Sequence, residues 1–391
     1  MIDSLNDLGM RIKRLDDSGR LILATVRSDE QNIPRQSPSN TTAIELDKRR
    51  AGYVDICARL NAMAVSDTPL VLYRPAATGR GNVSRRTRQY LTGKAGVVRT
   101  KQNMRIAQES DDFEIVDEHE ALTIMANPNP YMRGLADLRF VNAYSNEIAG
   151  NYYNAWVAGE SAIYPLTPLY MRIRPDETQG RLVDSYIYGR DTSQAMEFLP
   201  DEIIHGMLFP DYSQPYYGIS WLHGIIDTAD LWIATESYLR KTMQAEGRPP
   251  VLINLEGMHT DEQFQNARQS LTQRLKSALR RGLNFEFVGS HEGKATVLQL
   301  GHNPKDMTSV EIGNDAERTI GNAAGIPEPI YQMSSSNVAS ADTAERFWYK
   351  ATIMPRACRE AEVWTAWLRA NWDGTDEWFF APENMVPEDR A

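Results

Sequence analysis

The sequence has little of the chemistry that marks secreted proteins, zinc proteins or membrane proteins. Its two cysteines, Cys57 and Cys358, have apolar neighbours at helical spacing, so we expect buried thiols. No Cys-His spacing resembles a zinc site. No apolar run approaches the roughly 20 residues that span a bilayer, and the N-terminus lacks the profile of a signal peptide. We therefore expect a protein that is made and used in a cytoplasm, without membrane contact.

Sequence patterns of common catalytic sites are also missing. Residues 289–295 have the wrong spacing for a phosphate-binding loop, and no hydroxyl residue follows Lys294. Neither His119 nor His291, each followed by glutamate, precedes the second histidine of a metalloprotease helix. There is no Gly-x-Ser-x-Gly elbow. We therefore predict that the protein is not an enzyme and needs no metal and no cofactor. Each of the six histidines is expected to be a surface or hydrogen-bonded core residue.

Charge and composition limit the partners that we expect. With 42 Lys and Arg against 52 Asp and Glu, the net charge is −10. A protein that grips DNA through its phosphates usually has a basic face, so this balance argues against tight non-specific DNA binding. One basic cluster lies in a loop-like stretch at 76–96 and consists of Arg80, Arg85, Arg86, Arg88 and Lys94. Such a cluster could contact nucleic acid or the acidic surface of a partner. We favour the alternative that it is a solvated loop.

Hydrophobic periodicity and turn residues predict an α+β fold for the first half. Helices are expected where apolar residues recur at helical spacing, at 1–20, 45–65, 118–126 and 135–148. An extended connection is expected at 27–43, and Gly52 is a weak point within the second helix. Short strands are expected at 69–74, 151–157, 168–174, 182–188 and 201–205.

The pattern in the second half of the sequence predicts two helices, one on each side of a small insert. A helix over 221–246 meets a stop signal at Gly247. The insert, at 248–303, has the pattern strand–helix–strand–strand. A second helix follows at 306–324 and ends at a Gly-Ile-Pro sequence.

A long helix at 341–372 carries Pro355 near its middle. Proline removes a backbone donor and clashes with the preceding turn, so a kink is predicted there, although two helices in sequence would fit the same pattern. Residues 377–381 are strand-like, and an acidic end follows.

Several short motifs occur in an order that resembles one protein family. In chain order they are Asn127-Pro128-Asn129, Gly150-Asn151-Tyr152-Tyr153, Leu199-Pro200-Asp201-Glu202-Ile203-Ile204-His205, Tyr217-Gly218-Ile219-Ser220-Trp221-Leu222, Glu246-Gly247-Arg248-Pro249-Pro250, Gly321-Asn322-Ala323-Ala324-Gly325-Ile326-Pro327-Glu328-Pro329 and Ile353-Met354-Pro355. Taken together over about 45–390, they are similar to portal proteins of tailed bacteriophages, the HK97-like portal family.

The resemblance implies an α+β portal fold with a wing, a stem, a clip and a kinked tunnel helix. Mapped onto this sequence, the parts are an N-terminal arm (1–29), the wing (30–218), stem helix 1 (219–247), the clip (248–304), stem helix 2 (305–324), the tunnel-loop region (325–340), the kinked long helix of the wing (341–372) and a C-terminal strand and tail (373–391). Little sequence follows the long helix, so the crown would be short or absent.

By the same resemblance, the subunits form a ring, usually a homododecamer, at one capsid vertex of the virion. Double-stranded DNA passes through its channel during packaging and ejection. The ring docks the terminase large subunit and later the head–tail adaptor, and it contacts major capsid and scaffolding proteins after assembly in the host cytoplasm. Two alternatives stay open: another ring protein of the head–tail connector, and a hydrolase with an unrecognised site.

Two sets of residues are candidates for contacts with these partners. The tunnel loop would face DNA through an uncharged segment, Gln332, Met333, Ser334, Ser335, Ser336 and Asn337. A surface that slides along DNA should not neutralise phosphates, because each neutralised phosphate adds affinity and therefore friction. The clip helix carries Arg268, Arg274, Lys276, Arg280 and Arg281. Our hypothesis is that part of this basic set faces an acidic patch on terminase or adaptor, and ordinary solvation of the helix is the alternative.

Overall fold

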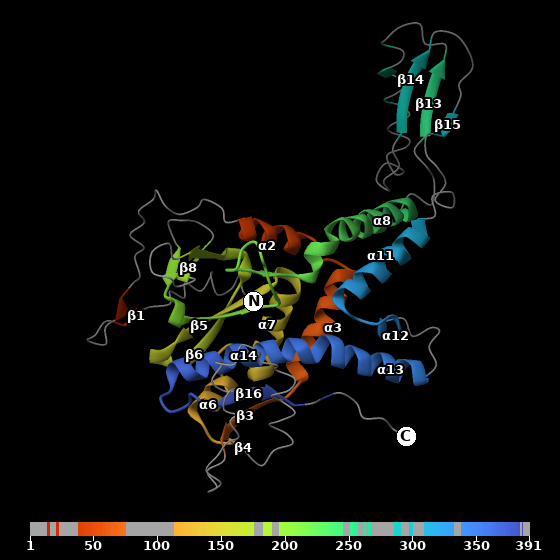
Figure 1. Ribbon diagram of the computed structural model, residues 1–391. Coiled ribbons are helices and arrows are strands. Elements are labelled where there is room, and N and C mark those ends of the chain that lie inside the picture. Colours follow the sequence, from red (N-terminus) through yellow and green to blue (C-terminus); the bar gives the residue numbers. More distant parts are fainter. Residues whose placement is uncertain are drawn as a thin grey trace. The chain divides into compact units, whose positions relative to one another are not determined.

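The chain divides into two compact units, whose elements are shown in Figure 1. The structure is a computed structural model that describes residues 14–15, 21–22, 38–75, 113–175, 183–189, 195–244, 251–256, 262, 265–266, 269, 285–290, 297–299, 309–331, 338–383 and 385. The first unit joins Met1–Ile226 to Ile320–Ala391, and the second unit is Asp227–Thr319.

Short antiparallel sheets and several helices build the first unit. The three-stranded sheets are, in spatial order, β16 (Phe379–Pro382)–β3 (Leu70–Pro75)–β4 (Phe113–Ile115), β10 (Ile203–Met207)–β5 (Asn151–Val157)–β6 (Ala162–Leu166) and β7 (Met171–Pro175)–β8 (Val183–Tyr188)–β9 (Met196–Phe198). The helices are α2 (Pro38–Lys48), α3 (Tyr53–Asp67), α6 (Glu120–Ala126), α7 (Leu135–Ala149), α12 (Glu328–Tyr331), α13 (Val338–Trp348) and α14 (Met354–Asn371).

Strand β5 separates two parts of the core because its side chains alternate between two faces. Trp156 points into a cluster with Trp364 and Leu368 of α14. Its neighbour Ala155 belongs to a different cluster with residues of β7 and β8. Six of the seven residues of β5 are buried, and this burial explains why the strand is rich in apolar and aromatic residues. The C-terminal helix α14 is therefore part of the same core as the central strands.

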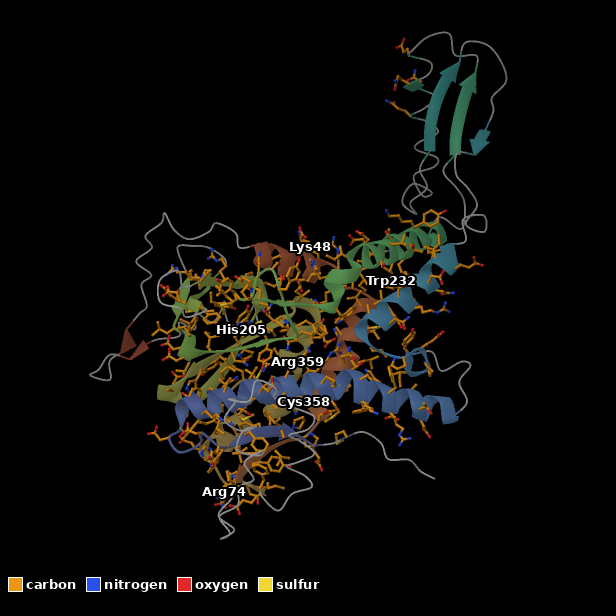
Figure 2. All side chains as sticks on the ribbon, viewed as in Figure 1. Lys48, Arg74, His205, Trp232, Cys358 and Arg359 are labelled. Carbon is orange, nitrogen blue, oxygen red and sulfur yellow. The ribbon has the colours of Figure 1, made fainter. Side chains whose placement is uncertain are left out.

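The second unit contains helix α8 (Ile226–Gln244), most of helix α11 (Ser309–Ala324) and a small sheet. In that sheet β13 (Val251–Glu256) pairs in parallel with β14 (Phe285–Ser290) and antiparallel with β15 (Val297–Gln299). Trp232 of α8, labelled in Figure 2, donates from Nε1 to Glu317 of α11 at 3.3 Å. Between β13 and β14, described helical residues are Glu262, Gln265, Asn266 and Gln269.

Most elements predicted in the first half are present. Strands β3, β5 and β8 and helices α6 and α7 lie where the sequence pattern placed them. Helix α7 ends at Gly150, which has φ 77° and caps the helix. Two predicted strands begin later than expected, because Pro168–Tyr170 and Pro200–Glu202 form 3-10 turns that start at a proline.

Three predictions near the N-terminus are contradicted where the structure describes the chain. A helix over 1–20 is contradicted at Arg14–Leu15, which pairs as a strand with Leu21–Ile22. The intervening sequence Asp-Asp-Ser-Gly favours a turn rather than a helix. The extended connection predicted at 27–43 is contradicted at 38–43, which belong to α2, and its remaining residues lie outside the described part of the chain. The single helix predicted at 45–65 is replaced by the end of α2 and by α3. Gly52 has φ 53°, which a helix cannot accommodate, so the helix breaks there.

Other sequence-based expectations concern specific side chains. Cys57 and Cys358 are buried thiols, as predicted. Among the described residues, no helix has the length and apolar content to cross a membrane. In the same part of the chain, no group of three or more His, Cys, Asp or Glu side chains is placed to hold a metal ion.

Candidate functional site at the Gly325 turn

The Gly-Ile-Pro sequence ends helix α11 with a tight, fully hydrogen-bonded turn. Gly325 has φ 76°, the left-handed conformation that favours glycine. Its N–H donates to the carbonyl of Asn322 at 3.0 Å, and the N–H of Ile326 donates to the carbonyl of Gly321 at 2.9 Å. This pair of bonds is the Schellman motif, and Ile326, which occupies the position where this motif usually makes an apolar contact, is buried.

Side chains from three other elements hold this turn in place. Asn61 of α3 donates from Nδ2 to the carbonyl of Ala324 at 3.0 Å. Arg356 of α14 donates to the same carbonyl at 3.1 Å, and Thr352 donates from Oγ1 to the carbonyl of Gly325 at 2.7 Å. Trp348 donates from Nε1 to Oδ1 of Asn61 at 3.0 Å. The carbonyls of Ala324 and Gly325 are thus satisfied by side chains that lie 27 or more positions away in sequence.

A buried ion pair lies behind these contacts. Glu147 of α7 is 1% exposed, and its Oε1 lies 3.1 Å from Nη1 of Arg356. Its Oε2 accepts hydrogen bonds from Asn61 at 3.0 Å and from Trp221 Nε1 at 2.9 Å. Burial raises the pKa of Glu147, and the charge of Arg356 opposes that rise. Burial likewise lowers the pKa of Arg356, and Glu147 opposes that fall.

A second buried ion pair joins α7 to α14. Arg139 and Glu360 have side chains 2% and 5% exposed, and their closest atoms, Nη2 and Oε2, are 2.9 Å apart. Arg139 Nε also donates to Glu360 at 3.0 Å. The remaining N–H groups of the guanidinium donate to the carbonyls of Val65, Ser66 and Thr68 at the end of α3. Arg139 of α7 therefore links the C-terminal end of α3 to the interior of α14.

Pro355 lies directly after a change in the helical hydrogen-bond pattern. Residues Tyr349–Ile353 form a π-helical turn between α13 and α14, in which the N–H of Met354 donates to the carbonyl of Tyr349. Pro355 is near the first position of α14, where its missing N–H is tolerated. Figure 1 shows α13 and α14 end to end. The predicted helix at 341–372 is therefore two α-helices joined by a π turn, and the kink itself stays a prediction.

The other residues singled out from the sequence lie outside the described residues. These are the tunnel-loop segment 332–337, the five basic residues of the clip helix and the basic cluster at 76–96. The structure instead describes both sides of the first segment: α12 ends at Tyr331 and α13 begins at Val338. The buried network around Ala324 and Gly325 is the best-defined feature next to it, and sequence reasoning missed this network.

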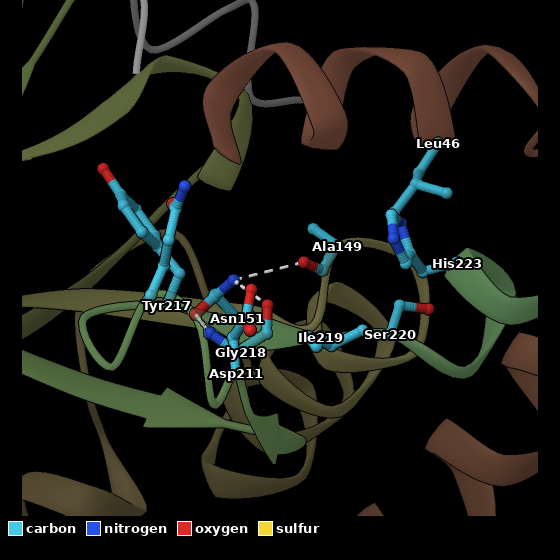
Figure 3. Close-up of a pocket in the computed structure, with 10 residues that line it drawn as sticks. Leu46, Ala149, Asn151, Asp211, Tyr217, Gly218, Ile219, Ser220 and His223 are labelled. Atoms are coloured by element: carbon cyan, nitrogen blue, oxygen red, sulfur yellow. Dashed lines mark hydrogen bonds between the residues drawn. The ribbon is translucent and has the colours of Figure 1, made fainter. Parts of the chain in front are cut away.

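Figure 3 shows a small pocket in the first unit. Its volume is about 90 Å³, and Leu46, Asp211 and His223 contribute to its wall. Small-molecule sites usually measure about 300–1,000 Å³, so this pocket has room for water molecules rather than for a cofactor. At its edge Asn151 donates to the carbonyls of Ala149 and Gly218 at 3.2 and 3.0 Å.

His205, labelled in Figure 2, illustrates the predicted role of the histidines. Its ring stacks on Tyr153 with ring centres 4.4 Å apart. Its Nε2 lies 3.1 Å from Oδ1 of Asn151, and its Nδ1 lies 3.3 Å from the hydroxyl of Tyr186. Burial lowers the pKa of His205 to about 3, so the ring stays neutral at physiological pH. It is a half-buried, hydrogen-bonded residue packed against the core, in line with the prediction.

The tight fit at Gly325 leads to a prediction. A Cβ atom at Gly325 would lie 2.6 Å from Thr352 Oγ1, whereas one at Gly374, also at positive φ, would meet nothing within 4 Å. We expect Gly374→Ala to lower the free energy of unfolding by about 1–2 kcal/mol through backbone strain alone. Gly325→Ala should lower it by about 3 kcal/mol, because steric overlap adds to that strain. Chemical denaturation of both variants measures the difference, and equal losses would contradict it.

Comparisons with known proteins identify relatives of this architecture. A family model described as phage portal protein matches residues 100–385. A search of curated proteins found no match. Among solved structures, one similar chain comes from the neck of a native gene transfer agent particle, computed with twelve-fold symmetry. It is 18% identical to this chain, with a TM-score of 0.56, and the match covers 91% of this chain and 87% of the matched chain.

Two further structures come from particles of the same type. A chain from the neck of an empty gene transfer agent particle, computed with six-fold symmetry, is 18% identical with a TM-score of 0.57. A chain from the virion of the native particle is 18% identical with a TM-score of 0.54. Each match covers 90% of this chain and 86% of the matched chain. At this identity the matches establish a shared fold.

Proposed function

The chain belongs to the phage portal protein family, and from this premise we propose that it forms the ring-shaped channel through which double-stranded DNA enters and leaves a phage-like particle. Portal proteins are structural virion components rather than enzymes. The observation that carries the proposal is the family match over residues 100–385, in agreement with the fold shared with neck subunits of gene transfer agent particles. The particle is a phage or a gene transfer agent.

A ring of twelve subunits is the assembly that we propose. The support is the twelve-fold symmetry with which a neck of the same fold was computed. Ring assembly requires each subunit to contact the next through two different surfaces, and the rotation must close. Electron microscopy of the purified protein tests the proposal. Rings with a central hole wide enough for duplex DNA are expected, and compact monomers at every concentration would contradict it.

Residues 332–337 are the part of the channel that we propose faces DNA. None of the six side chains is charged, and all are polar except that of Met333. The buried network at Ala324 and Gly325 supports this assignment, because it fixes the turn that leads into α12, the helix directly before the segment. A segment that contacts a moving polyanion benefits from a rigid base and from weak attraction to phosphate.

Adding positive charge to this segment should slow DNA movement. In a variant with Ser334→Lys, Ser335→Lys and Ser336→Lys, each subunit brings three cations toward the phosphates. We expect packaging in vitro to slow at least tenfold at low salt and to recover partly at high salt, because counterion release governs such contacts. The matched control is the same triple substitution to glutamine. An unchanged rate at all salt concentrations would remove the segment from the DNA path.

The basic residues of the clip helix are proposed to contact terminase or the head–tail adaptor. Reversing two charges, with Arg280→Glu and Arg281→Glu, should lower terminase-stimulated packaging several-fold while rings still form, because like charges then face the acidic partner. The control is Arg133→Glu, at a residue whose side chain is 91% exposed on the first unit. Equal packaging by both variants would favour ordinary solvation of the clip helix.

A further inference from the structure

A short hairpin presents one aromatic side chain entirely to solvent. The hairpin consists of β11 (Phe209–Pro210) and β12 (Gly218–Ile219), and Tyr212 at its tip is 99% exposed. Other large apolar side chains in the described part of the chain reach at most 63% exposure, the value of Phe347. A large aromatic residue that contacts nothing in its own subunit is a feature typical of interface anchors.

The loop that carries Tyr212 is held rigid. The N–H of Asp211 donates to the carbonyl of Tyr217 at 3.1 Å, and Tyr217 donates back to Gln214 at 3.0 Å. Ser213 donates from its backbone N–H and from its hydroxyl to Oδ1 of Asp211 at 2.8 and 2.7 Å. The loop therefore loses little conformational entropy when Tyr212 is covered.

The base of the hairpin is fastened to the core. The N–H of Ile173 on β7 donates to the hydroxyl of Tyr217 at 2.9 Å, and the N–H of Gly218 donates to Oδ1 of Asn151 at 2.7 Å. Arg359 of α14, labelled in Figure 2, places its guanidinium 5.0 Å from the ring centre of Phe209. The position of Tyr212 is therefore set by three elements of the first unit.

Helix α3 offers a surface that complements this tip. Most of the helix is buried, but Ile56 and Met63 are 50% and 53% exposed, and the side chain of Arg59 between them is 63% exposed. Their spacing of three and four residues puts all three on one face of the helix. Arg59 Nε lies 2.9 Å from Oδ2 of Asp55, one turn earlier on the same helix. We call Ile56, Arg59 and Met63 the α3 stripe.

We propose that Tyr212 of each subunit docks on the α3 stripe of the next subunit in the ring. This inference rests on the proposed ring. The occupant is a second copy of this chain because the two surfaces are complementary and different, as a head-to-tail contact requires. The tyrosine ring packs on the two apolar side chains and over the Arg59 guanidinium, while the Asp211 carboxylate faces the same cation. Hydrophobic, cation–π and ionic contacts then coincide at one position.

Crosslinking between subunits tests this arrangement. In a variant with Tyr212→Cys and Met63→Cys, a short bismaleimide should join each subunit to the next and produce a ladder of covalent oligomers up to the full ring. Each single variant should give no ladder, because Cys57 and Cys358 are buried. The matched control pairs Tyr212→Cys with Ile115→Cys, an apolar residue 56% exposed on β4, and should also give no ladder.

Association strength provides an independent measurement. Tyr212→Ala should weaken subunit association about 30-fold, the effect of losing an interface hot spot, while Tyr131→Ala, at a residue 45% exposed, should leave it within about twofold. The structure of the monomer is unaffected because Tyr212 is 99% exposed.

The outcomes separate this contact from the proposed function. Wild-type rings in the electron microscope together with no ladder, or with unchanged association of Tyr212→Ala, overturn the contact and leave the portal function standing. Dimers from the single Tyr212→Cys variant also overturn it, since they indicate a symmetric contact. Wild-type protein that never forms rings overturns the portal function itself.

Discussion

Replacing Arg139 by methionine is expected to lower the free energy of unfolding by about 3–5 kcal/mol, the loss typical of breaking a buried ion pair. The variant leaves Glu360 buried and charged without its partner. It also removes the donors for the carbonyls of Val65, Ser66 and Thr68. A buried acceptor without a donor costs about 1–3 kcal/mol by itself. Chemical denaturation at one fixed protein concentration measures the change.

Two control variants show whether charge or geometry matters at this position. Arg139→Lys keeps the charge but offers three donors from one atom instead of five in a planar fork, so it should recover less than half of the lost stability. Arg133→Ala removes an exposed arginine that pairs with Asp137 at 3.0 Å. Its effect should stay below about 1 kcal/mol, as for other surface ion pairs. A comparable loss from Arg133→Ala and Arg139→Met would contradict this account.

Replacing Glu147 by glutamine is expected to lower the free energy of unfolding by about 2–5 kcal/mol. Glutamine can still accept hydrogen bonds from Asn61 and Trp221, but Arg356, whose side chain is 10% exposed, is left without its negative partner. Because Arg356 also donates to the carbonyl of Ala324, the Gly325 turn should loosen too. Hydrogen exchange at the amides of Gly325 and Ile326 should therefore become faster.

A second substitution tests whether the unpaired cation causes this loss. Combining Glu147→Gln with Arg356→Met removes both charges, so the double variant should be more stable than Glu147→Gln alone. It should not reach the wild-type value, since Ala324 still lacks one donor. A double variant less stable than either single variant would show that packing rather than charge dominates at this site.

Local patterns were sufficient to place many elements. Helix α7 could be predicted because its apolar spacing ends at Gly150, and β5 could be predicted from its aromatic run. Local signals fail where two structures compete: a glycine can lie within a helix at a modest cost, but Gly52 separates α2 from α3. The π turn before Pro355 also has no local signature distinct from a kink or a helix end.

The sequence by itself determined the α+β class, most strands and helices, the Gly-Ile-Pro helix end and the resemblance to portal proteins, because these depend on residues close together in the chain. The tertiary structure alone decided which charges are buried. Arg139 and Glu360 are 221 positions apart, and the sequence around either residue does not indicate that both side chains are buried away from solvent. Likewise, only folding brings Asn61 within 3.0 Å of the carbonyl of Ala324, 263 positions away. Burial and pairing at such distances arise from packing, which local periodicity does not encode.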